Sequence, residues 1–335
     1  MPNNEVTTPE YSIVVPVFNE GENIAPLVER IEKVMEGVEG VHEIVIVDNG
    51  SYDATLAILD DLVCKYLSLV VVTLSRNFGY DGAIATGLEY TRGKWIIIMD
   101  GDQQDPPEVI PQFICKAKEG YDIVYGIRAK RTEGWLMGLQ MKTFYRIWTK
   151  IANISIPKDA GNFGILSCEV VNVINRMPER NKFIRGLRAW TGYPSTGIVY
   201  QRDQRNLGKT KFSFFSYLNN AINGITSFST VPLRMFTYLG AFGLIACIVF
   251  GIYVFLIRFL SLIGIDIVDF KYAGGWTTQS LLILTLISVN FIGLGIMGEY
   301  ISRISEEVKH RPNSLVRKVV RASDKKNFSK KTVEA

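Results

Sequence analysis

WIIIMDGDQQD, residues 95–105, joins an apolar run to two carboxylates that stand one residue apart, Asp100 and Asp102, and to the amide of Gln104. A run of large apolar residues is typical of a buried strand, which places the carboxylates at its carboxyl end. Ligands bind at the carboxyl ends of strands in open α/β sheets. Because Mg²⁺ and Mn²⁺ prefer oxygen ligands, the segment predicts a metal site formed by Asp100, Asp102 and Gln104.

The residues that follow have a simpler interpretation as the start of a helix. Asp105 is a good N-cap residue, two prolines follow it, and Glu108 stands where a capping box places a glutamate. This interpretation accounts for Asp105 and Glu108. It leaves the three oxygen ligands before them unexplained.

The first 130 residues alternate between β-branched apolar runs and helical patterns. The expected strands are residues 11–17, 43–47, 69–74, 94–100 and 122–126, and the expected helices are 23–35, 54–66, 81–91 and 107–118. This alternation predicts an α/β fold with a doubly wound, mostly parallel sheet that is covered on both faces. No G-x-G-x-x-G follows the first strand and no Walker lysine loop is present, which disfavours a dinucleotide-binding fold and a P-loop ATPase.

Polar residues follow each of the first four expected strands. The first three ends read PVFNE at 16–20, VDNGS at 47–51 and SRNFG at 75–79, and the fourth is the carboxylate cluster. One such end is ordinary turn chemistry. Four adjacent ends predict a cleft for a nucleoside diphosphate, in which Asp48 accepts a pyrimidine N–H and a metal bridges the diphosphate. The residues expected to bind this ligand are Pro16, Asn19, Glu20, Asp48, Arg76, Gly79, Asp100 and Gly101.

Two long uncharged segments lie near the C-terminus, 23 residues at 235–257 and 27 residues at 272–298. A helix rises about 1.5 Å per residue and a bilayer core needs about 20 residues, so both segments fit membrane spans. We expect spans at about 235–258 and 275–299. A buried core helix is the alternative, but two segments of this length in one tail disfavour it.

Charge predicts the orientation of these spans. Residues 302–335 hold ten Lys and Arg against four Asp and Glu, a net charge of +6, which leaves −2 for the rest of the +4 chain. The positive-inside rule therefore places the tail in the cytoplasm, and two spans place the N-terminal domain on the same side. The tail is otherwise a solvated charge run, or it binds anionic headgroups.

Together these motifs resemble a known family. The ordered set PVFNE, VDNGS, RNFG and DGDQQDPPE resembles the family 2 inverting glycosyltransferases with the GT-A fold. With RGLRAWTGY at 185–193, RNLGKTKF at 205–212 and two spans, the chain resembles the polyisoprenyl-phosphate glycosyltransferases. The bactoprenol glucosyltransferase type is closer than dolichol-phosphate mannose synthase. One departure is Asn49, because the family often has a second aspartate after the position of Asp48.

The resemblance implies an enzyme that transfers one hexose, with inversion, from a nucleotide sugar to a polyprenyl phosphate. The expected donor is UDP-glucose, the expected acceptor is undecaprenyl phosphate, and the expected cofactor is Mg²⁺ or Mn²⁺. Only two histidines are present, and neither is placed for general-base work. The resemblance makes Asp159 the catalytic base, although a turn is its simpler role. The cations expected at the phosphates are Arg128, Arg131, Arg205, Lys209 and Lys211, for each of which surface solvation is the alternative.

Two aromatic and basic segments are expected to be amphipathic helices at the membrane surface, unless they are ordinary helices packed on the core. We expect a cytoplasmic GT-A domain at residues 1–212, which includes the helix at 137–152, a juxtamembrane helix at 213–230, two transmembrane helices within 231–302 and a basic cytoplasmic tail at 303–335. The protein is thus expected to be integral to the inner, cytoplasmic membrane. We expect no nucleic-acid partner, and homo-oligomerisation stays open.

Three other functions are consistent with parts of this pattern. A GDP-mannose-dependent polyprenyl-phosphate mannose synthase would use the same site with another donor. A processive polysaccharide synthase shares the sheet and the carboxylates, but it would need a Q-x-x-R-W motif and more spans. A non-catalytic membrane module would be free to lose the metal ligands, yet Asp100, Asp102 and Gln104 are all present.

Overall fold

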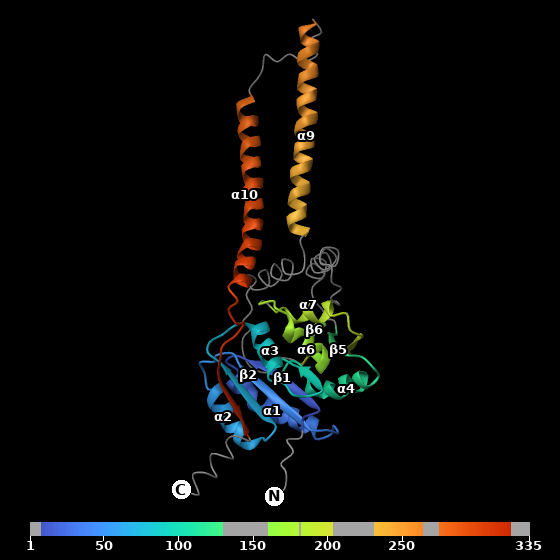
Figure 1. Ribbon diagram of the computed structural model, residues 1–335, viewed down its shortest axis with the longest axis vertical. Helices are drawn as coiled ribbons and strands as arrows, with labels where there is room; N and C mark the ends of the chain where they lie inside the picture. The colour runs from blue at the N-terminus through green and yellow to red at the C-terminus, as the bar shows by residue number, and fades with distance from the viewer. Residues whose placement is uncertain (1–7, 130–159, 181, 204–230, 264–274, 323–335) are drawn as a thin grey trace. The chain divides into compact units, whose positions relative to one another are not determined.

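The computed structural model describes residues 8–129, 160–180, 182–203, 231–263 and 275–322 of the 335-residue chain. These residues fall into two compact units (Figure 1), and each is described by itself. The first unit contains the sheet and includes residues 310–322 from the C-terminal region. The second unit contains two long helices from residues 231–309.

The first unit is built on one eight-stranded sheet with the order β7-β5-β6-β4-β1-β2-β3-β8. Its strands are β1 Tyr11–Val17, β2 His42–Asp48, β3 Leu69–Leu74, β4 Trp95–Ile98, β5 Ile123–Arg128, β6 Ala160–Ser167, β7 Ser195–Tyr200 and β8 Val316–Arg321. The first five strands confirm the sequence prediction to within two residues at each end. The sheet is mixed, however, because β6 runs antiparallel to β4 and β5, and β8 runs antiparallel to β3.

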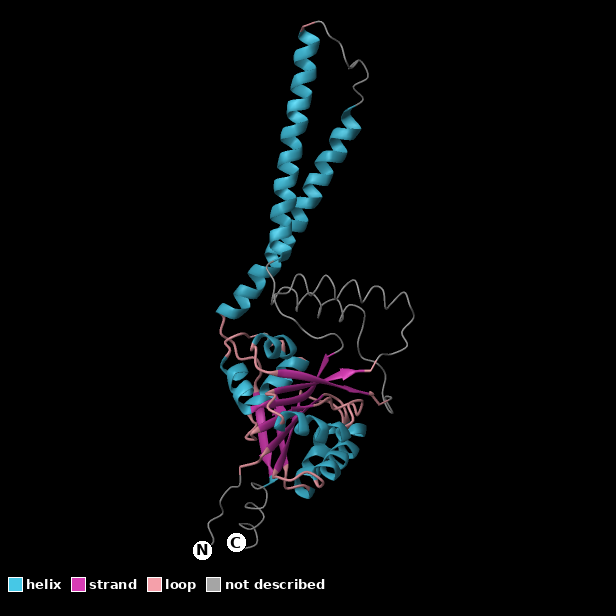
Figure 2. Ribbon diagram, turned by 90° about the vertical axis from the view of Figure 1, so that its right-hand side faces the viewer, coloured by secondary structure: helices cyan, strands magenta, loops and turns pink. Residues whose placement is uncertain are grey.

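Helices cover both faces of the sheet, as predicted (Figure 2). They are α1 Gly21–Met35, α2 Thr55–Lys65, α3 Tyr80–Glu89, α4 Ile110–Lys118 after the 3-10 turn η1 Pro107–Val109, α6 Cys168–Arg176 and α7 Ile184–Trp190. Helices α1, α2 and α4 contribute to the main core, whereas α3 packs with α6 and α7. Gly87 lets α3 lie close to the sheet, since a Cβ there would come within 2.4 Å of Val14 Cγ1.

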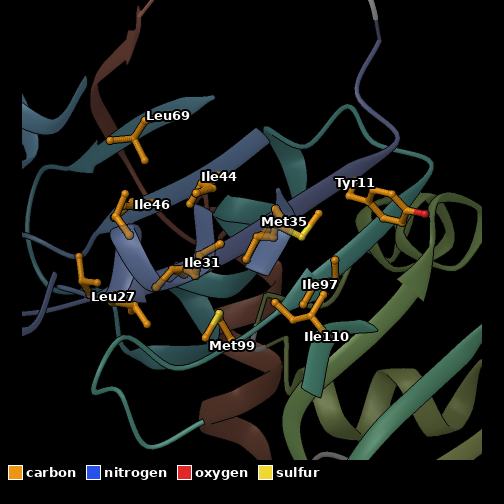
Figure 3. Close-up of a cluster of buried hydrophobic side chains, with 14 of the residues drawn as sticks. Tyr11, Leu27, Ile31, Met35, Ile44, Ile46, Leu69, Ile97, Met99 and Ile110 are labelled. Carbon is orange, nitrogen blue, oxygen red and sulfur yellow. The ribbon is translucent and has the colours of Figure 1, made fainter. Parts of the chain in front are cut away.

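The main core lies between β1, β2 and β4 and the helices α1 and α4 (Figure 3). All seven residues of β1 are buried, because the strand has neighbours on both edges and helices on both faces. Ile13 and Val15 point into this core, and Ile31 and Met35 of α1 meet them. This burial fixes the register of the central strands, and therefore the positions of the polar residues at their carboxyl ends.

The C-terminal strand β8 was not predicted, because the basic tail was expected to be solvated or lipid-bound. In the structure this strand pairs with β3 and buries Val320 against the core. Just before it, the Ser75 N–H donates to the Leu315 carbonyl at 2.8 Å, and the hydroxyls of Thr86 and Ser314 hydrogen-bond. Short, charged strands are typical of sheet edges, and VRKVVR is one of them.

The second unit contains α9 Val231–Leu262 and α10 Gly275–Val308. Each predicted span lies within one helix, and α10 continues past the predicted end of the membrane segment at 302. Among the described residues, Leu282–Val308 is long and apolar enough to cross a membrane, and the apolar stretch Phe236–Phe250 of α9 is shorter. Many large apolar side chains on both helices are exposed. Both crossings stay a prediction at this point.

Several predictions fall on residues that the structure does not describe. The amphipathic helices expected at 137–152 and 213–230 lie outside the described residues, as does the connection between the two long helices. Asp159, expected to act as the base or to form a turn, also lies outside the described residues, and the next residue, Ala160, begins β6.

The packing of β8 predicts a measurable contribution to stability. Val320→Ala removes two buried methyl groups and should lower the free energy of unfolding by about 2 kcal/mol. Lys318→Ala is the matched control in the same strand. Its side chain is 60% exposed and lies 3.8 Å from Asp60, so its loss should cost under about 0.5 kcal/mol. Urea unfolding of the purified protein in detergent measures both. Equal effects would mean that β8 is not packed on the core in solution.

Candidate functional site

The four predicted polar strand ends meet at one edge of the sheet. β1, β2, β3 and β4 are parallel neighbours, so their carboxyl ends lie side by side. Pro16 pairs with Val47 and Val17 with Asp48 in adjacent strands. Asp100 follows β4, which pairs with the other edge of β1. The sheet therefore brings Pro16, Asp48 and Asp100 to one edge, as the sequence predicted.

Two glycines allow these strand ends to approach closely. A Cβ on Gly101 would lie 2.7 Å from Val17 Cγ1 and 2.9 Å from the Pro16 carbonyl oxygen. Gly50 has a φ of +74°, and a Cβ there would lie 2.6 Å from the Arg76 carbonyl carbon. Side chains at either position would push the loops apart. The glycines thus keep the segments after β1, β2, β3 and β4 close together.

Asp48 presents a buried acceptor at this edge. Its side chain is fully buried, and its Oδ1 accepts a hydrogen bond from the Ser51 N–H at 3.2 Å. Its Oδ2 is also buried and has no hydrogen-bond partner among the described residues. Burial raises the pKa of this carboxyl above its usual value. A ligand N–H at Oδ2 would satisfy the oxygen and stabilise the charged form.

Asn49 braces the loop that carries Arg76. Its Oδ1 accepts from the Phe78 N–H at 2.9 Å, and its Nδ2 donates to the Asn77 Oδ1 at 3.2 Å and to the Gly79 carbonyl at 3.0 Å. An aspartate could accept the first bond but could not donate the other two. The departure from a second aspartate therefore has a structural reason in this chain.

The other residues expected to bind a nucleotide lie on the loops around this edge. The Asn19 N–H donates to Ser51 Oγ at 2.9 Å, and the Glu20 N–H donates to Thr55 Oγ1 at 3.0 Å, so both residues tie the β1 end to the β2 end. The Arg76 guanidinium is exposed and lies 4.1 Å from the centre of the Phe78 ring. Gly79 adopts a φ of +85° at the start of α3, and nothing lies within 4 Å of where its Cβ would be.

Arginines from distant strands surround the carboxylates after β4. Arg202 Nη2 lies 3.1 Å from Asp100 Oδ2 and 3.9 Å from Asp102 Oδ1. Arg128 Nη2, from the end of β5, lies 3.9 Å from the same Asp100 oxygen. The Tyr80 hydroxyl donates to Asp100 Oδ1. These cations balance carboxylates that would otherwise repel one another.

Asp105 belongs to this cluster, so its interpretation as a helix N-cap is wrong. Its fully buried carboxylate accepts from the Tyr200 hydroxyl at 2.7 Å and lies 3.5 Å from Arg202 Nε. Burial, followed by the charge of Asp100, raises its pKa to about 7. Glu108 likewise forms no capping box, because Arg30 holds both of its oxygens at 2.7 Å. Tertiary partners have replaced the local contacts that the sequence suggested.

Three members of the cluster were missed by sequence reasoning: Tyr80, Tyr200 and Arg202. Arg202 follows β7, whose short pattern STGIVY was not recognised as a strand. No local motif links a residue there to DGDQQD about 100 positions earlier. Tyr80 directly follows RNFG, and that proximity was the one available signal.

The predicted metal ligands are oxygen donors, which suit a divalent ion, although only two of them are carboxylates. Among the described residues, no group of three or more His, Cys, Asp and Glu side chains is arranged to hold a metal. However, Asp100 and Asp102 each direct an oxygen at the same nitrogen, Arg202 Nη2. A cation in that position would face both carboxylates. Gln104, whose N–H donates to Asp102 Oδ1 at 3.2 Å, would add an amide oxygen, and a diphosphate would supply the remaining ligands.

Most of the predicted catalytic residues lie outside the described residues. These are Arg131, Asp159, Arg205 and Lys211. Arg128 is described, and its guanidinium lies between Asp100 and Gly161, where a Cβ on the glycine would be 3.3 Å from Nη2. Its buried Nε has no hydrogen-bond partner among the described residues. Arg128 therefore has donor capacity to spare beside the carboxylates.

Comparison with known proteins places the chain in a family. Residues 12–170 match the family described as Glycosyl transferase family 2. An uncharacterized glycosyltransferase of Synechocystis sp. is 39% identical over 310 residues, which cover 92% of this chain and 95% of the relative. The prophage bactoprenol glucosyl transferase homolog of Escherichia coli K12 is 37% identical over 310 residues, which cover 92% and 98%.

Among solved structures, matches to this chain are found at lower identity. Mannosyl-3-phosphoglycerate synthase from Rubrobacter xylanophilus matches 64% of this chain and 73% of its own, with a TM-score of 0.46 and 17% identity. The assignment rests on the sequence relatives. The chain is a glycosyltransferase of family 2, and within that family it belongs to the polyisoprenyl-phosphate glycosyltransferases. The mixed sheet is accordingly of the GT-A kind.

The hydrogen bonds of the Asn49 side chain lead to a prediction about stability. Asn49→Asp removes two donated hydrogen bonds and places a buried charge near two oxygens, which should lower the free energy of unfolding by about 2 to 3 kcal/mol at pH 7. The deficit should shrink toward pH 4, because protonation of the new carboxyl removes the charge. Asn175→Asp is the control on α6, where one amide bond, to the Leu88 carbonyl at 3.2 Å, is at stake. Urea unfolding at pH 7 and at pH 4 measures the loss of unfolding free energy in both variants. A deficit that does not change with pH would exclude the charge effect.

Proposed function

We propose that this enzyme transfers one glucosyl residue from UDP-glucose to undecaprenyl phosphate, with inversion, at the cytoplasmic face of the membrane. The relatives named as bactoprenol glucosyl transferases support this assignment, among them that of Shigella phage SfX at 38% identity over 308 residues. The observation that carries it is the convergence of Asp48, Asp100 and Asp102 at one sheet edge with Arg128 and Arg202 beside them.

The donor would lie across the strand ends. The Oδ2 of Asp48, which has no hydrogen-bond partner among the described residues, would accept the N–H of the uracil ring, and this removes the cost of a buried, unsatisfied acceptor. Arg76 and Gly79 would stand beside the nucleoside, on the loop that Asn49 holds. The diphosphate would then point toward Asp100, Gly101 and the carboxylate cluster.

A divalent ion would be held by Asp100, Asp102 and Gln104. When bound, it would supply positive charge to the leaving diphosphate. Arg128 and Arg202 would add charge and hydrogen bonds to the same oxygens, since both guanidinium groups reach the cluster from the far strands. The predicted cations Arg131, Arg205 and Lys211 would complete the charge around donor and acceptor phosphates.

Transfer would proceed by one displacement. An oxygen of the lipid phosphate attacks the anomeric carbon, the bond from that carbon to the β-phosphate oxygen breaks, and UDP leaves from the opposite face. Asp159 would take the proton that a monoprotonated acceptor still carries, or orient the acceptor. Most of a phosphate monoester is already a dianion at pH 7, since its second pKa is about 6, so a strong base is not required.

The strand β8 supports two membrane crossings. β3 precedes the long helices in the chain and β8 follows them, yet both belong to one sheet. A sheet cannot be assembled across a bilayer, so the chain must return to the side from which it left. We therefore infer an even number of crossings between the two strands. Two crossings, by α9 and α10, would meet this condition, and α9 is a long apolar helix.

The metal proposal predicts complete dependence on a divalent ion. Asp102→Asn should lower turnover by about 100-fold or more while the fold is retained, because it removes a charged ligand. Excess EDTA should silence the wild type, and Mn²⁺ or Mg²⁺ should restore it. Transfer of labelled glucose to undecaprenyl phosphate in detergent measures both, with the exposed Asp60→Asn as control. Full wild-type activity in EDTA would remove the metal from the mechanism.

The role of Asp159 predicts a pH dependence. Asp159→Asn should lower turnover strongly at pH 6, where the acceptor often carries a proton, and less at pH 8, where the dianion forms unaided. Turnover at saturating donor, measured at both pH values and divided by that of the wild type, is the readout. An equal loss at both pH values would leave only a positioning role. Near-normal activity at both would exclude Asp159 from the site.

A further inference from the structure

Arg202 stands where the predicted metal ligands converge. Its Nη2 lies 3.1 Å from Asp100 Oδ2 and 3.9 Å from Asp102 Oδ1, and its Nε lies 3.5 Å from Asp105 Oδ1. One guanidinium thus bridges three carboxylates. The position that faces both predicted charged ligands of the metal is already held by a positive charge of the protein itself.

The backbone beside Arg202 is fixed, whereas the side chain has access to solvent. The Asp203 N–H donates to the Gln104 carbonyl at 2.9 Å, and the Asp203 carboxylate accepts from Arg30 at 2.9 Å. These contacts tie the end of β7 to the loop of the predicted ligands. The Arg202 side chain is 25% exposed. It can therefore change partners without moving the strand that carries it.

The charges around this point favour a metal that arrives together with an anion. Asp100, Asp102 and Asp105 carry up to three negative charges, and Arg128 and Arg202 carry two positive ones. A divalent ion would change this net charge from −1 to +1, and a diphosphate that arrives with it would return the net charge to −1 or below. Electrostatics thus favours joint binding, because the diphosphate offsets the repulsion between the metal and the two arginines.

We propose that Arg202 is the counter-ion of Asp100 and Asp102 in the free enzyme. When the donor and the divalent ion bind, its guanidinium leaves these carboxylates to the ion and moves to the donor diphosphate. In the free enzyme it keeps the carboxylates close together without metal. In the enzyme with metal and donor bound, its positive charge stabilises the leaving diphosphate. Metal binding then depends on donor binding through one side chain. This inference rests on the proposed function, because it takes the diphosphate of a nucleotide sugar as the second partner.

The sign of one measurement separates this role from a structural one. If Arg202 only holds the ligands in place, its removal loosens them and weakens metal binding. If Arg202 competes with the metal, its removal strengthens metal binding in the absence of nucleotide. Coupling free energies are reciprocal, so the effect of UDP on metal affinity equals that of metal on UDP affinity. Loss of the competing cation should reduce the effect of UDP on metal affinity and the effect of metal on UDP affinity by the same factor.

The experiment is a Mn²⁺ titration of the full-length protein in detergent, with free Mn²⁺ measured by electron paramagnetic resonance, with and without UDP. Arg202→Gln should bind Mn²⁺ about tenfold more tightly than the wild type without UDP, and UDP should improve its affinity less. Arg202→Lys keeps a cation and should resemble the wild type. Arg30→Gln is the control, since its guanidinium also bridges two carboxylates, Glu108 and Asp203, that are not predicted ligands.

Each outcome is decisive. Weaker or unchanged Mn²⁺ binding by Arg202→Gln would overturn the inference, as would an equal gain in Arg30→Gln. A melting curve of each variant checks that the fold is retained, and Arg202→Met, which also lacks the charge, replaces Arg202→Gln in the titration if that variant unfolds. Failure of the proposed function is a separate result. It would appear as no labelled glucose on undecaprenyl phosphate with wild-type enzyme and metal, whatever the Mn²⁺ titrations show.

Discussion

Three aspartates lie close together after β4 because the chain turns at Gly101 and Asp102, and two guanidinium groups among them offset their mutual repulsion. Those cations come from β5 and β7, on the far side of the antiparallel strand β6. The strands β5 and β7 are therefore required to supply the positive charges that offset the carboxylates after β4. Neither half would form this site alone, since the parallel strands supply anions and the mixed strands supply cations.

The same sheet constrains the part of the chain that contains the two long helices. Two long helices with exposed apolar side chains are inserted between β7 and β8 in the sequence, yet β8 closes the edge beside β3. Closure begins at Ser75 and Thr86, which flank the loop that carries Arg76. The C-terminal segment thus supports a nucleotide loop as well as an edge. An insertion that leaves and returns to one sheet can anchor the enzyme without dividing its site.

Local patterns predicted the parallel half of the sheet well. The strands β1 to β4 are apolar runs with a turn after each, and their carboxyl ends necessarily share an edge, so Asp48, Asp100 and Asp102 could be placed together from the sequence alone. Long-range pairing could not be predicted. Asp105 looked like an N-cap because Pro106 and Pro107 follow it, but its partner is Tyr200, 95 positions away. Arg202 was not predicted for the same reason, since no residue near it in the sequence indicates that it pairs with a carboxylate.

Asn49 shows how one departure from a family pattern can be absorbed. A second aspartate after Asp48 would add an anion to strand ends that already hold four aspartates, directly beside a carboxyl whose pKa is raised by burial. The amide avoids that repulsion and supplies two donors, to Asn77 Oδ1 and to the Gly79 carbonyl. Asp48 is then the one carboxylate at the carboxyl end of β2, where its buried oxygen suits a ring N–H. Charge near Asp48 is thereby kept low, while the carboxylate cluster after β4 is highly charged and balanced by arginine. The proposed donor, with a neutral base and an anionic diphosphate, would match that gradient, and a neutral sugar without the diphosphate would not.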